Sequence, residues 1–165
     1  MGEEPELRLA MSAIAPVERV MAVLNQVMHL APATKLTLLV ENFNGTMERL
    51  DDGDVDIAIT ESTADGSGYE HAVVGQVEFV SVVSSASPFA NKAATLNERD
   101  MEDTTQIIVR DTSYTEKKTV GVLKSVTPWV VNDAIMKKLI IASGMGWGPC
   151  RDTWWKTKSK TANLS

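Results

Sequence analysis

The strongest constraint on the fold is the alternation of short apolar runs with helical segments in the first sixty residues. Strands are predicted at residues 7–11, 35–41 and 55–59 from apolar runs bounded by polar or turn-forming residues. A long helix is predicted to begin at Pro16 and end near Leu30, since proline is tolerated in a first helical turn. A shorter helix is expected between the second and third strands. This β-α-β-α-β order predicts a parallel sheet with right-handed crossovers.

The second half of the chain continues the α/β alternation. Further strands are predicted at residues 76–83, 106–109, 120–123 and 127–131, with a short acidic helix at residues 97–103. The longest strand candidate is read as the passage into a second lobe. The expected organisation is a first lobe over residues 5–75 and a second lobe over residues 76–148.

A capped helix closes the second lobe. Asn132 or Asp133 can accept the free amides of its first turn, and Gly144 stands where a left-handed C-cap is favoured. The helical spacing predicts one apolar face and one lysine face. The apolar face comprises Ile135, Met136, Leu139 and Ile140, and the opposite face comprises Lys137 and Lys138. The glycines after this helix predict a turn into another strand.

Composition excludes several classes of protein. The formal net charge of −6 argues against a basic nucleic-acid-binding face on this chain alone. A single cysteine, Cys150, offers no disulfide framework and indicates a reducing compartment. The acidic N-terminus has no signal-peptide core, and no apolar run approaches the roughly 18 residues needed to span a bilayer. The expected location is therefore cytoplasmic, with no membrane partner.

A series of motifs in a fixed order resembles the effector-binding domain of LysR-type transcriptional regulators. It runs from about Pro5 to Gly148 and includes an Asp52-Gly53 turn before the third strand and a Ser87-Pro88 pair where the family has His-Pro. The other motifs are the entry strand from Pro5 to Ala10, the stretch from Asn44 to Leu50, the run from Arg110 to Ser113, Trp129 with Val131, and the glycine run from Gly144 to Gly148.

The resemblance implies two Rossmann-like lobes joined by a hinge, a type 2 periplasmic-binding-protein-like fold, with a small-molecule effector in the cleft. In the family a winged helix-turn-helix and a dimerising linker helix precede this domain. Neither is found in this sequence, so the chain is not expected to bind an operator. The resemblance also suggests a homodimer through the helix Pro16–Leu30, whose apolar residues occupy more than one stripe. No cofactor is implied.

The tail from residue 149 to residue 165 departs from the family pattern. Its composition changes abruptly to lysine, threonine and two adjacent tryptophans, Trp154 and Trp155, without helical or strand period. Back-translation with permitted codons, read one base earlier, yields Met-Pro-Arg-His-Val-Val-Glu-Asp-Glu, which is similar to the family's tail. We therefore expect a frameshift near Pro149 and an aberrant, disordered tail that leaves the fold incomplete at the C-terminus. Codons incompatible with the second frame would refute this, and a divergent natural tail is the alternative.

Candidate effector-binding residues follow from the rule that α/β lobes bind ligands at the carboxyl ends of strands and at helix N-termini. The candidates are Ser12, Ala13, Asn44, Gly45, Thr46, Ser84, Ser85 and Asn132. Free amides beside hydroxyl groups suit a carboxylate or another small polar anion. The structural alternative is that Asn44 and Asn132 only cap their helices. Arg110 and Asp111 are interpreted as a solvated strand end.

Catalysis and metal binding have little support. The two histidines, His29 and His71, have no partners at a recognised triad or metal spacing, so the chain is not predicted to be an enzyme. Two alternatives to effector binding remain. A transporter's solute-binding protein would need a secretory signal or lipobox. A non-functional regulator fragment would show poor solubility or aggregation when expressed alone.

Overall fold

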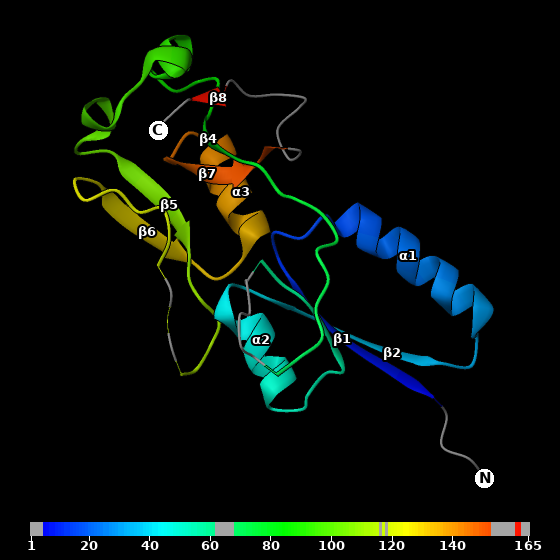
Figure 1. Cartoon of the computed structure of the whole chain (residues 1–165). Coiled ribbons are helices and arrows are strands. Elements are labelled where there is room, and N and C mark those ends of the chain that lie inside the picture. The colour runs from blue at the N-terminus through cyan, green and yellow to red at the C-terminus, as the bar shows by residue number, and fades with distance from the viewer. Residues whose placement is uncertain (1–4, 62–67, 116, 118, 153–160, 163–165) are drawn as a thin grey trace. The chain divides into compact units, whose positions relative to one another are not determined.

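The computed structural model describes residues 5–61, 68–115, 117, 119–152 and 161–162, and the chain divides into two compact units (Figure 1). Unit 1 comprises Met1–Gly75 and Asp111–Lys118, and unit 2 comprises Gln76–Arg110 and Thr119–Ser165. Residues 111–118, which were predicted to lie in the second lobe, thus belong to unit 1.

The sheet of unit 1 is parallel, as the alternating pattern predicted. Its strands β1 (Glu6–Ser12), β2 (Lys35–Glu41) and β3 (Ile57–Ile59) lie in the order β2-β1-β3. In this register Leu9 of β1 pairs with Leu38 on one side and with Ile57 on the other. All three strands therefore end at the same edge of the sheet, where β1 ends at Ser12.

Two helices connect these strands. Helix α1 (Val17–Leu30) buries Val20 and Leu24 in a core that also contains Leu9 and Met11 of β1. Helix α2 (Asn44–Asp51) contacts all three strands of the sheet. Most other large apolar residues of α1 are exposed in this chain, and Met28 is half-buried. The exposed ones are Val17, Met21, Val23, Val27 and Leu30.

Unit 2 contains a mixed sheet. Its order is β6-β5-β7-β4-β8, in which β5 is parallel to both of its neighbours and β4 is antiparallel to both of its own. The bounds are β4 Phe79–Val83, β5 Thr105–Val109, β6 Thr127–Val131, β7 Trp147–Arg151 and β8 Thr161–Ala162. The strand that the glycine turn was expected to introduce is therefore present as β7.

The beginning of the tail is ordered. Pro149, Cys150 and Arg151 belong to β7 and pair with β4, so the expectation of a tail without strand structure is wrong for these residues. Residues 153–160 and 163–165, including Trp154 and Trp155, lie outside the described residues. The frameshift hypothesis concerns codons and stays a prediction.

Three short segments of unit 2 differ from their predictions or refine them. The acidic helix forms as a 3₁₀ turn (η2, Glu98–Met101) capped by Asn97, after an unpredicted 3₁₀ turn (η1, Ala90–Thr95). The predicted strand at residues 120–123 is a loop. The reason is the buried side chain of Gln106, which donates to the carbonyl of Gly121 (2.6 Å) and accepts from the amide of Leu123 (3.0 Å). These bonds occupy backbone groups that a strand would need for pairing.

Helix α3 (Ala134–Ala142) presents the opposite face from the one predicted. Ala134, Lys137 and Ile141 are buried, whereas three residues of the predicted apolar face are exposed. These are Ile135 (68% exposed), Met136 (48%) and Leu139 (57%). Space at Gly148 explains the reversal, since a Cβ there would lie 3.1 Å from Lys137 Cε. Burial lowers the pKa of Lys137.

Both ends of α3 follow the predicted capping. Asp133 is the N-cap, and its Oδ1 accepts the amide of Met136 at 2.6 Å. Gly144 has φ +83°, the left-handed conformation expected after the helix. Asn132 is therefore not the capping residue.

Candidate functional site

The predicted residues of unit 1 meet at the carboxyl edge of its sheet. Ser12 ends β1 and pairs in register with Glu41, the last residue of β2. The amide of Ala13 donates to the Glu41 carbonyl at 2.8 Å, and α2 begins three residues later at Asn44. The ends of β1 and β2 thus place Ser12 and Ala13 beside the chain that leads into α2, as the strand-end rule predicted.

Thr46 is the most unusual of these residues. It is 0% exposed, and its hydroxyl Oγ1 has no hydrogen-bond partner among the residues that the structure describes. A buried hydroxyl without a partner is unfavourable by about 1–3 kcal/mol, and such groups are rare in folded proteins. The first turn of α2 therefore contains a polar group whose hydrogen-bonding capacity is unused in this state.

The backbone that enters α2 is strained. Phe43, the residue preceding the helix, has φ +51° and ψ −123°, a region that residues with a side chain rarely adopt. Such a conformation costs about 1–3 kcal/mol and persists only where the surroundings enforce it. Its position between Asn42 and Asn44 puts this strain beside the unsatisfied Thr46 hydroxyl.

The amides at the start of α2 already have acceptors. The amide of Asn44 donates to Asp111 Oδ2 at 3.4 Å. The amides of Gly45 and Thr46 donate to the carbonyls of Asn42 (3.1 Å) and Phe43 (3.4 Å). The expectation of free amides is therefore not met at α2. The structural alternative for Asn44 fails as well, because the N-cap is Phe43 and no side chain caps the helix.

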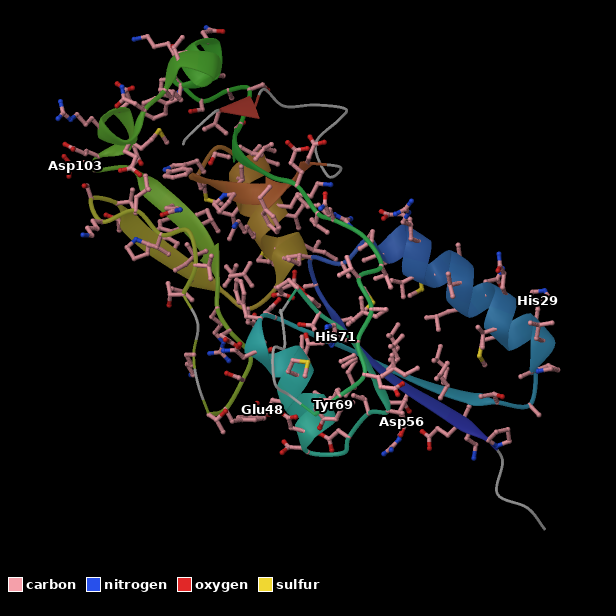
Figure 2. All side chains as sticks on the ribbon, viewed as in Figure 1. His29, Glu48, Asp56, Tyr69, His71 and Asp103 are labelled. Atoms are coloured by element: carbon pink, nitrogen blue, oxygen red, sulfur yellow. The ribbon has the colours of Figure 1, made fainter. Side chains whose placement is uncertain are left out.

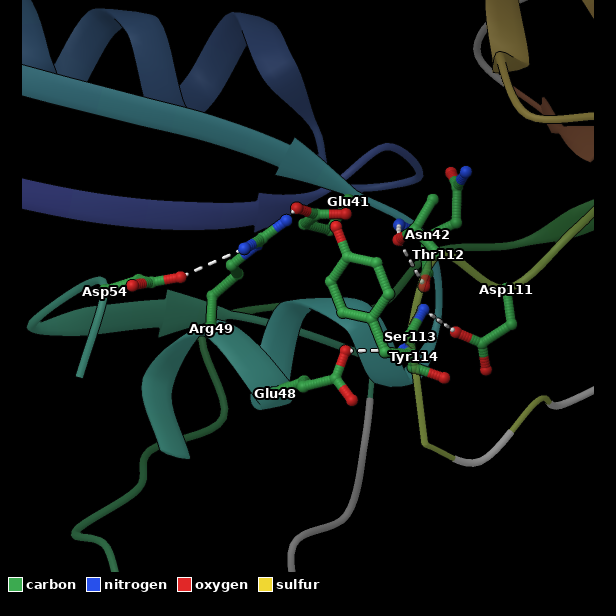
Figure 3. A network of polar contacts seen from close by, with 9 residues as sticks. All are labelled: Glu41, Asn42, Glu48, Arg49, Asp54, Asp111, Thr112, Ser113 and Tyr114. Atoms are coloured by element: carbon green, nitrogen blue, oxygen red, sulfur yellow. Dashed lines mark hydrogen bonds and ion pairs between the residues drawn. The ribbon is translucent and has the colours of Figure 1, made fainter. Parts of the chain in front are cut away.

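Residues Asp111–Thr115, here called the strap, bind to α2 through polar contacts (Figure 3). Asp111 is only 2% exposed, so its interpretation as part of a solvated strand end is wrong. Its Oδ1 accepts the amide of Ser113 at 2.9 Å. The hydroxyl of Thr112 accepts the amide of Asn42 at 2.8 Å. These bonds fix the strap at the helix start.

Glu48 holds the far end of the strap. Its carboxylate accepts the amide of Tyr114 (2.7 Å), and both the amide (3.1 Å) and the hydroxyl (2.8 Å) of Thr115. These bonds, led by that from Tyr114, lower the pKa of Glu48. Gly45 permits the close approach of the strap to α2, since a Cβ at that position would collide with Thr112 Oγ1. The strap and α2 are thus shaped for each other.

Arg49 adds an ionic group beside the strap. Its guanidinium contacts Glu41 Oε1 at 2.7 Å and Asp54 Oδ2 at 3.0 Å, and lies 5.7 Å from the centre of the Tyr114 ring (Figure 3). Hydrogen bonds to Glu41 and Asp54 raise the pKa of Arg49 further. These ion pairs link the end of β2 to α2. They neutralise the charge of Arg49 with two acidic residues of the same chain.

The predicted residues of unit 2 have different environments. Ser84 is buried, and its hydroxyl donates to the carbonyl of Ala142 (3.3 Å) and accepts the amide of Ala86 (3.3 Å). Its hydroxyl is therefore used in holding the end of β4 to α3. Ser85 and Asn132 are exposed, in a turn after β4 and just before α3.

The histidines lie on separate elements of unit 1 (Figure 2). His29 is near the end of α1, where its Nδ1 lies 2.9 Å from the carbonyl of Asn25, and His71 is in an extended segment. Within the described ranges there is no group of three or more His, Cys, Asp or Glu residues that could hold a metal ion. Among those same residues no helix is long and apolar enough to cross a membrane.

A surface hollow of about 470 Å³ lies against Asn25, Gln26, His29 and Leu30 of α1. It contains none of the predicted site residues, and three of its four lining residues come from the last turn and a half of an exposed helix. It offers no buried polar group comparable with the Thr46 hydroxyl. The start of α2 is therefore the better candidate site.

The sequence profile of one family, described as the LysR substrate binding domain, matches residues 2–156. The chain belongs to this family. The domain is the effector-binding part of LysR-type regulators, and the resemblance seen in the motifs is confirmed. The match also covers β7 and part of the tail. No curated protein matches the chain in sequence.

Solved LysR-type domains share the fold. The reduced OxyR regulatory domain of Pseudomonas aeruginosa has a TM-score of 0.67 at 13% identity, with 98% of this chain and 82% of that one covered. The effector-binding domain of QuiR in complex with shikimate gives 0.72 at 13%, covering 99% and 82%. The CcmR regulatory domain of Synechocystis in complex with 2-PG gives 0.62 at 14%, covering 98% and 81%. These likenesses confirm the two-lobed α/β fold of the LysR domain.

Sequence reasoning missed Asp111, Ser113 and Glu48. Their role depends on contacts across about 67 residues of sequence, as between Asp111 and Asn44. One local signal was available. The Asp-x-Ser spacing of residues 111 to 113 favours a turn in which the carboxylate accepts the amide two residues later. That signal predicts the turn but does not predict its docking on α2.

Proposed function

We propose that this effector-binding domain takes a small polar molecule that hydrogen-bonds to the Thr46 hydroxyl at the first turn of α2. The observation that carries the proposal is the burial of this hydroxyl without a partner among the described residues. A ligand oxygen or N–H at that position would recover a hydrogen bond worth about 0.5–1.5 kcal/mol. Because Thr46 is fully covered, binding requires local opening of the chain around it.

The remaining contacts are proposed from their positions at strand and helix ends. In unit 1 they are Ser12, Ala13, Asn44 and Gly45, which share the carboxyl edge of the sheet with Thr46. In unit 2 they are Ser84, Ser85 and Asn132, of which Ser85 and Asn132 are exposed. The structural relatives QuiR and CcmR hold shikimate and 2-phosphoglycolate, which supports a small-molecule effector, with carboxylates among the candidates.

The chain is further proposed to act without catalysis, in the cytoplasm, and without binding nucleic acid itself. It has a net charge of −6, and its histidines lie on separate elements.

A homodimer through α1 is also proposed, since Val23 (59% exposed) and Leu30 (87%) leave apolar surface on that helix. The exposed Leu139 (57%) of α3 is a second apolar surface for such pairing. Sedimentation velocity of Val23→Glu against the parent chain tests the dimer, which the acid should dissociate.

A thermal-shift panel tests the effector proposal. It contains small carboxylates and aromatic acids, each beside its neutral amide, at concentrations well above a millimolar Kd. A ligand present at 100 times its Kd raises stability by about 2.7 kcal/mol. We expect at least one compound to raise the Tm of the chain and to lose that effect in Thr46→Val.

The matched control is Thr37→Val. The Thr37 hydroxyl donates to Glu6 Oε1 at 2.9 Å on β2, away from α2. This variant removes the same group from the same unit and should keep the ligand-induced shift. Uniform absence of stabilisation across the panel would instead favour the non-functional fragment.

A further inference from the structure

The first turn of α2 is closed by a carboxylate that the chain itself supplies. Asp111 is 2% exposed and accepts the amide of Asn44, while the next two amides donate to backbone carbonyls. In the same turn the Thr46 hydroxyl is fully buried and has no partner among the described residues. At the helix start, the Asp111 carboxylate therefore already occupies the position of a bound anion. The Thr46 hydroxyl beside it has no hydrogen-bond partner among the described residues.

The filled subsite changes the chemistry of the site. A helix N-terminus carries roughly half a positive elementary charge, which one buried carboxylate already offsets. A second carboxylate brought close to Asp111 would meet like-charge repulsion, which is strong where water is excluded. A hydroxyl or another neutral group has no such penalty and can bond with Thr46.

We propose that Asp111 is a specificity-determining residue, a built-in anion that closes the α2 subsite to carboxylates and selects an effector with a neutral hydrogen-bonding group, such as a hydroxyl, facing Thr46. This inference rests on the proposed function, because it takes Thr46 as an effector contact. It confines the exclusion to α2, so an effector carboxylate is bound, where one exists, by other residues.

The strap geometry supports a fixed position for the Asp111 carboxylate. Its second oxygen accepts the amide of Ser113 at 2.9 Å, and Thr112 bonds to both backbone polar groups of Asn42. Gly45 lacks the Cβ that would collide with Thr112 Oγ1. The two residues that follow Asp111 thereby hold its carboxylate at the helix start.

Removal of the carboxylate and its replacement by free acetate tests the inference. The full chain and the variants Asp111→Gly and Asp111→Ser are titrated with sodium acetate, against sodium chloride at equal ionic strength, while the NMR signals of the Asn44, Gly45 and Thr46 amides are followed. We expect saturable acetate binding to both variants, roughly tenfold or more tighter than to the parent chain. Asp111→Asn keeps an oxygen at the Asn44 amide but removes the charge, so it should bind acetate more tightly than the parent chain and less tightly than Asp111→Gly.

The matched control is Asp52→Gly, which removes an exposed carboxylate at the opposite end of α2 and changes the net charge equally. It should leave the acetate response of the Asn44 amide unchanged. Acetate binding by the parent chain as tight as by Asp111→Gly would overturn the inference. So would absence of acetate binding in both variants while their α1 amide signals show a folded unit. Asp111→Ser keeps a hydroxyl for Ser113, which preserves the test if Asp111→Gly fails to fold.

The failure of this inference can be told apart from failure of the proposed function. A panel acid that has no hydrogen-bonding group except its carboxylate, binds the parent chain, loses binding in Thr46→Val and has an inactive neutral amide would overturn the exclusion by Asp111. It would at the same time support Thr46 as an effector contact. An amide that binds as well as its acid supports both.

Discussion

Substitution of Thr46 by valine should stabilise the ligand-free protein, which is the reverse of the usual result for a buried residue. Valine has nearly the shape of threonine and similar helix propensity, so packing and local conformation are preserved. The change removes a buried Oγ1 that lacks a partner among the described residues. Since such a group costs about 1–3 kcal/mol, we expect the free energy of unfolding to rise by about 1–2 kcal/mol.

Urea denaturation followed by circular dichroism measures this change, and a thermal scan provides a second readout. For a chain of this length a gain of about 1–2 kcal/mol raises Tm by roughly 2–8 °C. The control Thr37→Val should change stability in the opposite direction, since it breaks the 2.9 Å bond to Glu6. Its expected loss is about 0.5–1.5 kcal/mol.

Thr46→Val should bind the effector more weakly, although the variant is expected to be more stable than the parent chain. With an effector identified, Thr46→Val should weaken its binding by about tenfold, the equivalent of one lost hydrogen bond of about 1.4 kcal/mol. A lower free energy of unfolding in Thr46→Val would refute the reasoning, because it would mean that the hydroxyl is satisfied in the native state. Stabilising substitutions that cost function are expected at binding sites.

Three further substitutions test other parts of the structure. Lys137→Met should raise the free energy of unfolding at pH 7 by about 1 kcal/mol or more, measured in urea; because burial lowers the pKa of Lys137, the gain should shrink as pH rises toward the ordinary lysine value, and a pH-independent gain would refute that cause. Glu48→Gln should speed hydrogen exchange of the Tyr114 amide at neutral pH; the lowered pKa of Glu48 means that its stabilisation is present above its ordinary pKa and is lost as pH falls through the folded value, so parent and variant should converge in acid. Gly148→Ala should lower the free energy of unfolding by about 1–3 kcal/mol in the same urea assay, because the new Cβ would lie 2.6 Å from the Ile107 carbonyl; an unchanged midpoint would show that the strands separate freely.

The strands and long helix of unit 1 were predictable because their signals are local. The run from Lys35 to Glu41 lies between a proline-containing turn and a polar segment, and β2 has those bounds. The same holds for β6, which follows a turn and ends before the capped helix. In both cases alternation of side chains and flanking turn residues specify the element without reference to any distant segment.

The face of α3 was not predictable in this way. Helical spacing places Ile135 and Leu139 together, and a burial rule based on polarity turns them inward. The structure turns Lys137 inward because Gly148, on another strand, leaves space for its methylene stem. The orientation of α3 depends on the absence of a Cβ atom at Gly148. The spacing of apolar residues within the helix carries no information about that position.

The candidate site was predictable in position but not in content. Strand ends and a helix start located Ser12 and Thr46 correctly at one edge of the sheet. The amides there were expected to be free, yet the amide of Asn44 donates to Asp111, which lies 67 residues further along the chain. Such a contact has no signature in the residues around Asn44, so only the folded chain reveals it.

The discontinuity of unit 1 has a consequence for the growing polypeptide. Residues up to 75 emerge from the ribosome first, but the donors that satisfy Glu48 belong to Tyr114 and Thr115. The segment 76–110, which belongs to unit 2, is synthesised in between. In a nascent chain stopped at residue 110, α2 therefore lacks the strap. Unit 1 reaches its native form only after part of unit 2 has left the exit tunnel.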